Sequence, residues 1–293
     1  MLYDVTLRID YTYSHPRDQT RNLLRLLPID IPNLQRIPEW KLALTPLPSE
    51  RYGFVDFFGN NVTSAAWHSP IEEVKISLSF RAERLTEPAR FMMSPDIDRL
   101  GHVLASLRDA TPLSPLHFTT PTRRAPIETV MTNFAHDHLA PGLSALDAVQ
   151  AIGRAIHTEM TYSSDATDVD TEALDAFEKR AGVCQDFAHI MIACLRGVGI
   201  PAGYVSGFLR TFPPPGKEKL VGVDAMHAWV RAWVGPEVGW VEFDPTNNQF
   251  AGTDYITIGY GRDYDDIAPV RGTMRGVGRQ SSRQSVDVQP VEA

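Results

Sequence analysis

The chain has 293 residues, of which 43% are hydrophobic and 22% charged, so it can bury a core in one large or two ordinary domains. Its net charge of −8 and its lack of a Lys/Arg-rich run argue against nucleic acid as a partner. It begins Met1-Leu2-Tyr3-Asp4 with no leader pattern and contains no apolar run of about 18 residues, so we expect a cytoplasmic protein with no membrane partner.

The first third of the chain is patterned as β-structure. Apolar and polar residues alternate from Tyr3 to Tyr13, and again from Trp40 to Leu44 and from Val74 to Ala82. The stretch from Phe57 to Val62 has the composition of a hairpin turn. We therefore predict a β-sandwich-like domain over residues 1–120, with a Pro-rich linker at its end that could hold a short helix from Ile97 to Leu107.

The pattern then becomes helical. We expect helices from Ile127 to Leu139, from Ser144 onward and from Thr171 to Arg180, where Ser144 with Asp147 is a helix-start signal. The predicted strands follow at Gly203 to Arg210, Ala225 to Val234 and Val238 to Asp244. Helices followed by strands indicate an α+β core over residues 121–276. Residues 277–293 have no apolar period and are expected to form a disordered tail.

The stretch from Gly182 to Phe187 places a cysteine at the start of a strongly patterned helix. Phe187, Met191, Cys194 and Val198 continue it as an apolar stripe. The free N–H groups of a helix start favour a thiolate over a thiol, and Cys184 lies there. Cys194 lies in the stripe, ten residues or roughly 15 Å further along the axis, so we expect a buried free thiol there and no disulfide. Free thiols fit a reducing compartment.

A histidine and an aspartate follow on two neighbouring strands. A two-residue turn after Val234 would place His227 directly opposite Asp244, and a loop two residues wider would place them diagonally on the same face. A shift by one residue would put them on opposite faces. Cys184, His227 and Asp244 could thus form a nucleophile, base and orienter set. The pattern alone leaves open a buried cysteine, a half-buried core histidine and an Asp-Pro turn.

Four blocks of the second half have a recognisable order. They are Gly182-Val183-Cys184-Gln185-Asp186-Phe187-Ala188-His189, Tyr204-Val205-Ser206-Gly207-Phe208-Leu209, His227-Ala228-Trp229-Val230 and Gly239-Trp240-Val241-Glu242-Phe243-Asp244-Pro245-Thr246-Asn247. They resemble the successive motifs of the bacterial transglutaminase-like proteins. The resemblance extends to Leu23–Pro28, Asp56–Asn60 and Gly261–Asp266 but not to residues 86–126 or the tail. It implies a papain-like core, with the cysteine helix packed on an antiparallel sheet, in which Cys184 is the nucleophile, His227 the general base and Asp244 the orienting acid.

Further residues are candidates for lining the site or for stabilising an oxyanion. The backbone N–H of Cys184 is one donor by position, and Tyr162 is a candidate for the second. Asp186 could cap the helix or bond a neighbouring loop, Gln185 lies beside the nucleophile, and Trp229 is a candidate for core or cleft wall. Other candidate walls are Tyr204, Phe208 and the loop of residues 211–223.

The sequence gives no sign of a cofactor or a metal. His136, His138, His157 and His189 lack the paired Cys or Glu spacing of a zinc site, and the glycines form no phosphate-binding pattern.

We therefore expect an enzyme that acts on a peptide or protein substrate, at a peptide bond or a Gln side chain, through a thioester at Cys184. Cross-linking, deamidation and hydrolysis all begin with that acyl-enzyme. The alternative is a non-catalytic polypeptide-binding module that keeps the same fold.

Overall fold

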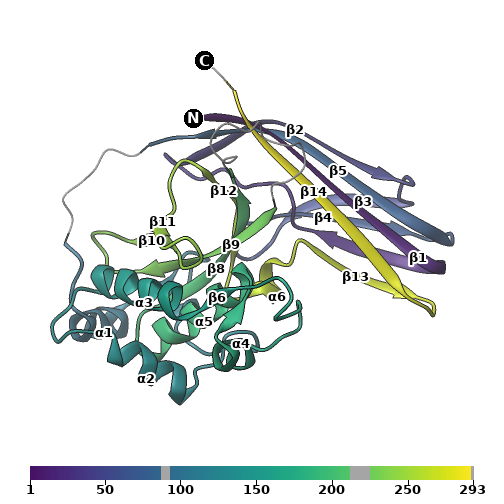
Figure 1. The fold of residues 1–293 in the computed structure, drawn as a ribbon. Coiled ribbons are helices and arrows are strands. Elements are labelled where there is room, and N and C mark those ends of the chain that lie inside the picture. The colour runs from purple at the N-terminus through teal and green to yellow at the C-terminus, as the bar shows by residue number, and fades with distance from the viewer. Residues whose placement is uncertain (87–92, 212–224, 292–293) are drawn as a thin grey trace, which may run out of the picture.

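The computed structural model describes residues 1–86, 93–211 and 225–291 (Figure 1). Its first half is built around one long strand, β1 (Leu2–Leu24), which belongs to two sheets. Up to residue 17, β1 pairs with β5 and β14, and from residue 18 it pairs with β4 and β13. β2 pairs with β5, and β3 pairs with β4. The bounds are β2 (Gln35–Thr45), β3 (Glu50–Val55), β4 (Asn61–Trp67), β5 (Ile71–Arg84), β13 (Val270–Arg275) and β14 (Gln280–Pro290).

The expected alternation along β1 decides which face is buried. Tyr3, Val5, Leu7 and Ile9 are at most 3% exposed, while the residues between them reach solvent. They share one apolar cluster with Trp67 of β4 and with other residues of both sheets. The predicted strands and the hairpin between β3 and β4 are present, and the overall α+β class is confirmed.

The C-terminal residues correct the prediction of a disordered tail. β14 pairs with β1 from Tyr3↔Pro290 to Tyr13↔Gln280, and Val286 and Val288 are fully buried against the first sheet. The β half is therefore completed by the end of the chain, and residues 277–291 lie within it (Figure 1).

The second half is a helical layer on a five-stranded antiparallel sheet of order β11-β10-β9-β8-β12. Figure 1 shows the helices on one side of this sheet and the long strands of the first half on the other. The bounds are α2 (Thr129–Asp137), α3 (Ala145–Glu159), β6 (Thr161–Tyr162), α4 (Ala173–Lys179), β7 (Ala181–Gly182), α5 (Cys184–Gly197), β8 (Ala202–Leu209), β9 (Met226–Trp233), β10 (Trp240–Asp244), β11 (Gln249–Phe250), β12 (Tyr255–Gly261) and α6 (Tyr264–Ile267). A short 3-10 helix, η1, spans Pro115–Phe118.

The helix expected in the linker belongs to this second half. α1 (Ile97–Ser106) is capped by Asp96, which accepts a hydrogen bond from the backbone N–H of Arg99 at 2.8 Å. Leu100 of α1 is fully buried in the cluster that surrounds α5. The boundary predicted near residue 120 therefore comes too late, because the core begins before α1.

The two halves meet along β12, an edge strand of the five-stranded sheet. The side-chain amide of Gln35 donates to the carbonyl of Thr257 at 2.7 Å and accepts from its N–H at 2.9 Å. Asn60 makes the same pair of bonds with Tyr260, at 2.7 and 2.8 Å. The two amides supply the hydrogen bonds that another strand would otherwise make, so the exposed edge of β12 is covered.

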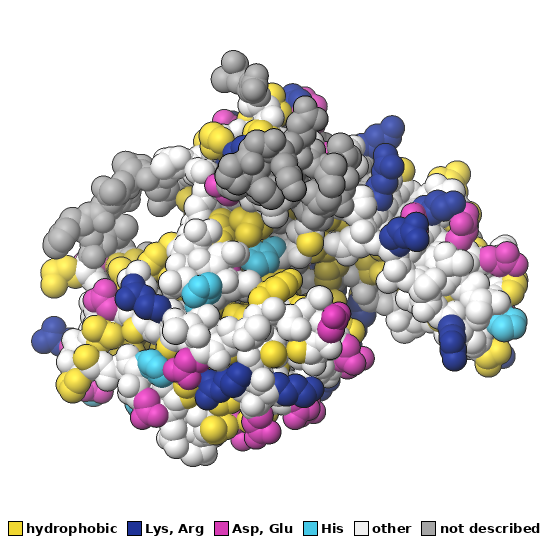
Figure 2. All heavy atoms as spheres, viewed as in Figure 1, with side chains coloured by type: hydrophobic (Ala, Val, Ile, Leu, Met, Phe, Trp, Pro, Cys, Tyr) yellow, Lys and Arg dark blue, Asp and Glu magenta, His cyan; other side chains and the backbone are white. Residues whose placement is uncertain are grey.

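On the face drawn in Figure 2, acidic and basic side chains are interspersed over the helical half, and neither charge forms a continuous patch there. In the described residues, no helix has both the length and the apolar content needed to cross a bilayer.

The role of β14 can be tested by truncating one buried side chain. Val286→Ala should lower the free energy of unfolding by roughly 1–3 kcal/mol, because it leaves a cavity against β1. Gln284→Ala, an exposed position on the same strand, is the control and should change stability by less than about 0.5 kcal/mol. Urea unfolding measures both. Equal midpoints for the two variants would show that β14 does not stabilise the sheet.

Candidate active site

The nucleophile candidate sits at the first residue of α5. Val183 is the N-cap, and the buried carboxylate of Asp186 accepts hydrogen bonds from the Val183 N–H at 2.8 Å and from the Thr167 hydroxyl at 2.6 Å. A Cβ at residue 182 would lie 2.5 Å from the same carboxylate oxygen, so only glycine allows this approach. Asp186 thus holds the helix start, the structural alternative considered for it.

The two cysteines lie in different surroundings. Cys194 is fully buried, its thiol donates to the carbonyl of Met131 at 3.4 Å, and burial raises its pKa to about 12. Cys184 is partly exposed. An accessible thiol at a helix start has the setting of a reactive cysteine, whereas Cys194 has that of an inert one.

His227 and Asp244 are brought together by the register of β9 and β10. Trp240 pairs with Trp233, so the connecting loop is the wider of the two considered, and His227 lies diagonally from Asp244 on the same face. The imidazole Nε2 donates to Asp244 Oδ2 at 2.7 Å. This bond leaves the other ring nitrogen, Nδ1, available to the thiol.

Asp244 is fully buried and heavily hydrogen-bonded. Besides His227, its carboxylate accepts from the Tyr255 hydroxyl at 2.8 Å, the Asn247 side-chain amide at 2.7 Å and the Thr246 N–H at 2.8 Å. Burial by itself raises the pKa of a carboxyl, but His227 and these donors hold the pKa of Asp244 below its usual range. The carboxylate therefore stays charged beside the imidazole.

His227 also contacts Cys184. Burial lowers the pKa of the imidazole, but hydrogen bonds to Asp244 and to Cys184, with the charges of both, outweigh burial and raise it to about 10. The fold thus joins three side chains from α5, β9 and β10. A thiolate and an imidazolium held over a buried carboxylate can attack a carbonyl and transfer a proton.

The other predicted site residues differ in exposure and in their hydrogen-bond partners. Tyr162 is 59% exposed on β6, which pairs with β7 just before Cys184, and burial together with the charge of Cys184 raises its pKa. Gln185 turns away and donates to the Val169 carbonyl at 3.2 Å. Trp229 is buried under His227, with ring centroids 6.1 Å apart, and its indole N–H donates to Glu242 at 2.7 Å. Of the three side chains, only Tyr162 has a polar group free for a substrate.

The candidate cleft walls differ from one another. Tyr204 is buried beside the site, and its pKa is raised by burial and then by the charge of Cys184, whereas Phe208 is fully buried in the contact with the first half. Most of the loop 211–223 lies outside the described residues.

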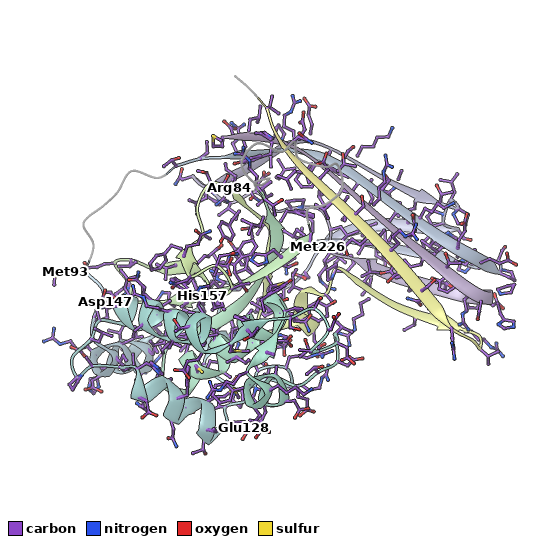
Figure 3. All side chains as sticks on the ribbon, in the orientation of Figure 1. Arg84, Met93, Glu128, Asp147, His157 and Met226 are labelled. Carbon is purple, nitrogen blue, oxygen red and sulfur yellow. The ribbon has the colours of Figure 1, made fainter. Side chains whose placement is uncertain are left out.

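Three of the four histidines considered as metal ligands, His138, His157 and His189, have structural partners. His189 is buried, accepts from the N–H of Tyr264 at 3.2 Å, and has a pKa lowered to about 3 by burial. His138 bonds Glu159 at 3.0 Å, and His157 Nδ1 lies 3.0 Å from the Thr246 carbonyl, beside the end of β10 (Figure 3). Within residues 1–86, 93–211 and 225–291, no three His, Cys, Asp or Glu side chains are grouped so that they could hold a metal ion.

Sequence reasoning missed two partners of Asp244. Asn247 was quoted only as part of the last block, and Tyr255 was not singled out, because every residue of β12 is buried and its sequence marks no one side chain as a site residue. An Asn three residues after a strand-ending Asp is a turn signal that could have found the first.

Known proteins resemble this chain along most of its length. Residues 132–245 match the model of the Transglutaminase-like superfamily, and residues 3–83 match that of the bacterial transglutaminase-like N-terminal region. The chain belongs to the transglutaminase-like superfamily. An uncharacterized protein of Mycobacterium tuberculosis is 32% identical over 99% of this chain and 93% of its own length. One from Mycobacterium leprae is 31% identical over 92% and 91%.

Two further similarities are informative, one to a solved structure and one to a protein named for an enzyme activity. The fold is that of a crystal structure described as a "Putative Cysteine Protease from Cytophaga hutchinsonii", with a TM-score of 0.78 and 22% identity over 100% of this chain and 91% of that one. A protein-glutamine gamma-glutamyltransferase of Pseudomonas aeruginosa is 39% identical over 87 residues, which are 29% of this chain and 13% of that protein.

The charge state of the imidazole can be observed directly. In the folded protein, ¹⁵N NMR should show His227 doubly protonated at pH 8 and His189 neutral at pH 5. Because the pKa of His227 is raised from 6.5, the stability that it contributes is full below pH 6.5 and declines as the pH rises toward 10. A His227 ring that titrates near pH 6.5 would contradict the ion pair.

Proposed function

We propose that this chain is a thiol-dependent enzyme that transfers or hydrolyses the acyl group of an amide. Cys184 is the nucleophile, His227 the general base and acid, and Asp244 the residue that orients the imidazole. The observation that carries the proposal is the contact of one imidazole with both the Cys184 thiol and the buried Asp244 carboxylate.

The chemistry proceeds in two steps. The thiolate attacks the amide carbonyl to form a C–S bond, the C–N bond breaks, and the His227 imidazolium gives its proton to the leaving nitrogen. Water or an amine then attacks the thioester, and His227 takes the proton of the attacking group. The C–S bond then breaks, the acyl product leaves, and the proton held by His227 restores the starting thiol and imidazole pair. Asp244 keeps Nε2 protonated, so Nδ1 is the nitrogen that exchanges protons with the reacting atoms.

The oxyanion of each tetrahedral intermediate needs donors at the start of α5. The backbone N–H of Cys184 is one, and we propose the Tyr162 hydroxyl as the second. Two observations support Tyr162: β6 pairs with β7, which leads into Cys184, and the charge of Cys184 acts on the phenol. The Gln185 amide and the Trp229 indole already have protein acceptors.

The substrate we propose is a peptide or protein, attacked at a Gln side chain or a peptide bond. The stretch similar to the Pseudomonas gamma-glutamyltransferase supports the Gln side chain as acyl donor. We propose the cytoplasm as the compartment, since a reducing environment keeps Cys184 free. The alternative, a non-catalytic binding module, would not need an imidazole held against a thiol.

Alkylation tests the activated thiol without a known substrate. Iodoacetamide should label Cys184 at pH 6–7 at least about tenfold faster than Cys194, whose raised pKa and burial suppress the thiolate. Mass spectrometry of tryptic peptides measures both rates, and His227→Ala should slow only the labelling of Cys184. Equal, slow labelling of both cysteines would overturn the proposed function.

The role of Asp244 can be measured on a Gln-containing peptide that the wild type turns over. Asp244→Asn keeps the shape but removes the charge, and we expect kcat to fall by roughly 10–10³-fold, about 1.4–4 kcal/mol. The loss should be smaller than in a serine enzyme, because a thiol ionises more readily than a hydroxyl.

Cys184→Ala should abolish covalent turnover and serves as the background. Release of ammonia versus chain cleavage, read by mass spectrometry, identifies the reaction. Turnover by Asp244→Asn at the wild-type rate would remove Asp244 from the mechanism.

A further inference from the structure

Tyr255 touches the same carboxylate oxygen that holds the imidazole. Its hydroxyl lies 2.8 Å from Asp244 Oδ2, and His227 Nε2 lies 2.7 Å from that atom. The Gln249 side-chain amide donates to the Tyr255 oxygen at 2.7 Å. Because that oxygen already accepts a hydrogen bond, its own proton is directed to Asp244. The order of donation is therefore Gln249 to Tyr255 to Asp244, with His227 as a further donor to the same carboxylate oxygen.

The ring of Tyr255 is fixed by packing. It is 1% exposed and meets the Trp229 ring edge to face, with centroids 5.2 Å apart. Burial, followed by the charge of Asp244, raises the pKa of the phenol far above its ordinary value. Tyr255 therefore stays protonated, and it remains a donor throughout the pH range in which the site could work.

Side chains of the N-terminal β half form hydrogen bonds with the chain on both sides of Tyr255. The Tyr3 hydroxyl donates to Asp254 Oδ1 at 2.9 Å, one residue before it. Gln35 bonds both backbone groups of Thr257, two residues after it, at 2.7 and 2.9 Å. Arg84, marked in Figure 3 at the contact of the two halves, donates to the Gly252 carbonyl at 3.3 Å. β12 reaches the active site with a position set by the other half of the molecule.

We propose that Tyr255 is a positioning residue for Asp244 and that the N-terminal β half sets its place through Tyr3 and Gln35. This inference rests on the proposed function, because it gives the β half a role in that same site. The β half is then part of the machinery that orients the imidazole, in addition to any part in binding substrate.

Among the described residues, two ionisable groups act directly on the His227–Asp244 pair, namely Cys184 from α5 and Tyr255 from β12. Removing the Tyr255 hydroxyl takes one donor from the charged form of Asp244, so its carboxyl becomes easier to protonate. A protonated Asp244 no longer holds an imidazolium. The thiolate–imidazolium pair should then form at a higher pH than in the wild type.

The test is the pH profile of Cys184 alkylation by iodoacetamide, measured on the full chain. Tyr255→Phe should move the acid limb up by about 0.5–1 pH unit, which is a three- to tenfold slower rate at a pH on that limb. Tyr260→Phe is the matched control: it lies on the same strand, is also buried, and loses a bond to Glu242 at 3.0 Å instead. A profile for Tyr255→Phe that equals the wild type, or the same shift in both variants, would overturn the positioning role.

The part played by the β half is tested by Gln35→Met, which keeps the size of the side chain and removes its bonds to Thr257. Its acid limb should shift in the same direction as that of Tyr255→Phe. If Gln35→Met does not fold, as judged by near-UV circular dichroism, Tyr3→Phe removes the hydroxyl that bonds Asp254 and answers the same question. A folded variant with the wild-type profile would show that the β half does not set Tyr255.

The two levels of the proposal fail in different ways. Absence of selective Cys184 labelling in the wild-type chain would overturn the proposed function itself. Selective labelling in the wild type with no shift in Tyr255→Phe would leave that function intact and overturn only the positioning role.

Discussion

The buried carboxylate of Asp244 is the constraint on which the arrangement of the site depends. An unpaired charge in a protein interior costs several kcal/mol, so it is tolerated only with partners on nearly every lone pair. Asp244 finds them in His227 on β9, Tyr255 on β12 and the turn after β10 at Thr246 and Asn247. One charge thus requires three strands and a turn to keep their mutual positions.

The position of β12 in turn depends on the other half of the molecule. An edge strand has outward N–H and carbonyl groups that must be bonded or left to water. Gln35 and Asn60 bond these groups at Thr257 and Tyr260, and a Cβ at Gly259 would lie 2.1 Å from the Asn60 side-chain oxygen. A glycine is therefore needed where Asn60 approaches. The contact between the halves therefore includes specific hydrogen bonds from these side chains in addition to apolar packing.

The sequence was sufficient where local pattern and chemistry coincide. The apolar stripe located α5, and the Ser144 cap, with its bond from the Asp147 N–H at 3.1 Å, located α3. The parity of β9 and β10 put His227 and Asp244 on one face, although only the structure decides that the loop is the wider one. These features depend on residues within about twenty positions of one another, so the pattern that produces them is visible in a single sequence.

The features that escaped prediction depend on distant partners. Every residue of β12 is buried, so its sequence does not show which of its side chains face the active site. β14 is largely polar and pairs with β1, which lies more than 260 residues away in the sequence. Val286 and Val288 are its only buried hydrophobic residues. Neither strand can be predicted from its own sequence without knowing the part of the fold against which it packs. The same holds for the domain boundary before α1.

Two buried carboxylates flank the reacting groups, and their different surroundings suit different tasks. Asp244 faces a cation, which holds its pKa down, while Asp186 has only the Thr167 hydroxyl and the Val183 N–H, so that burial raises its pKa. The Asp186 carboxylate anchors the start of α5 through these two hydrogen bonds. The Asp244 carboxylate instead places its charge directly beside the imidazole of His227, where it favours the protonated ring.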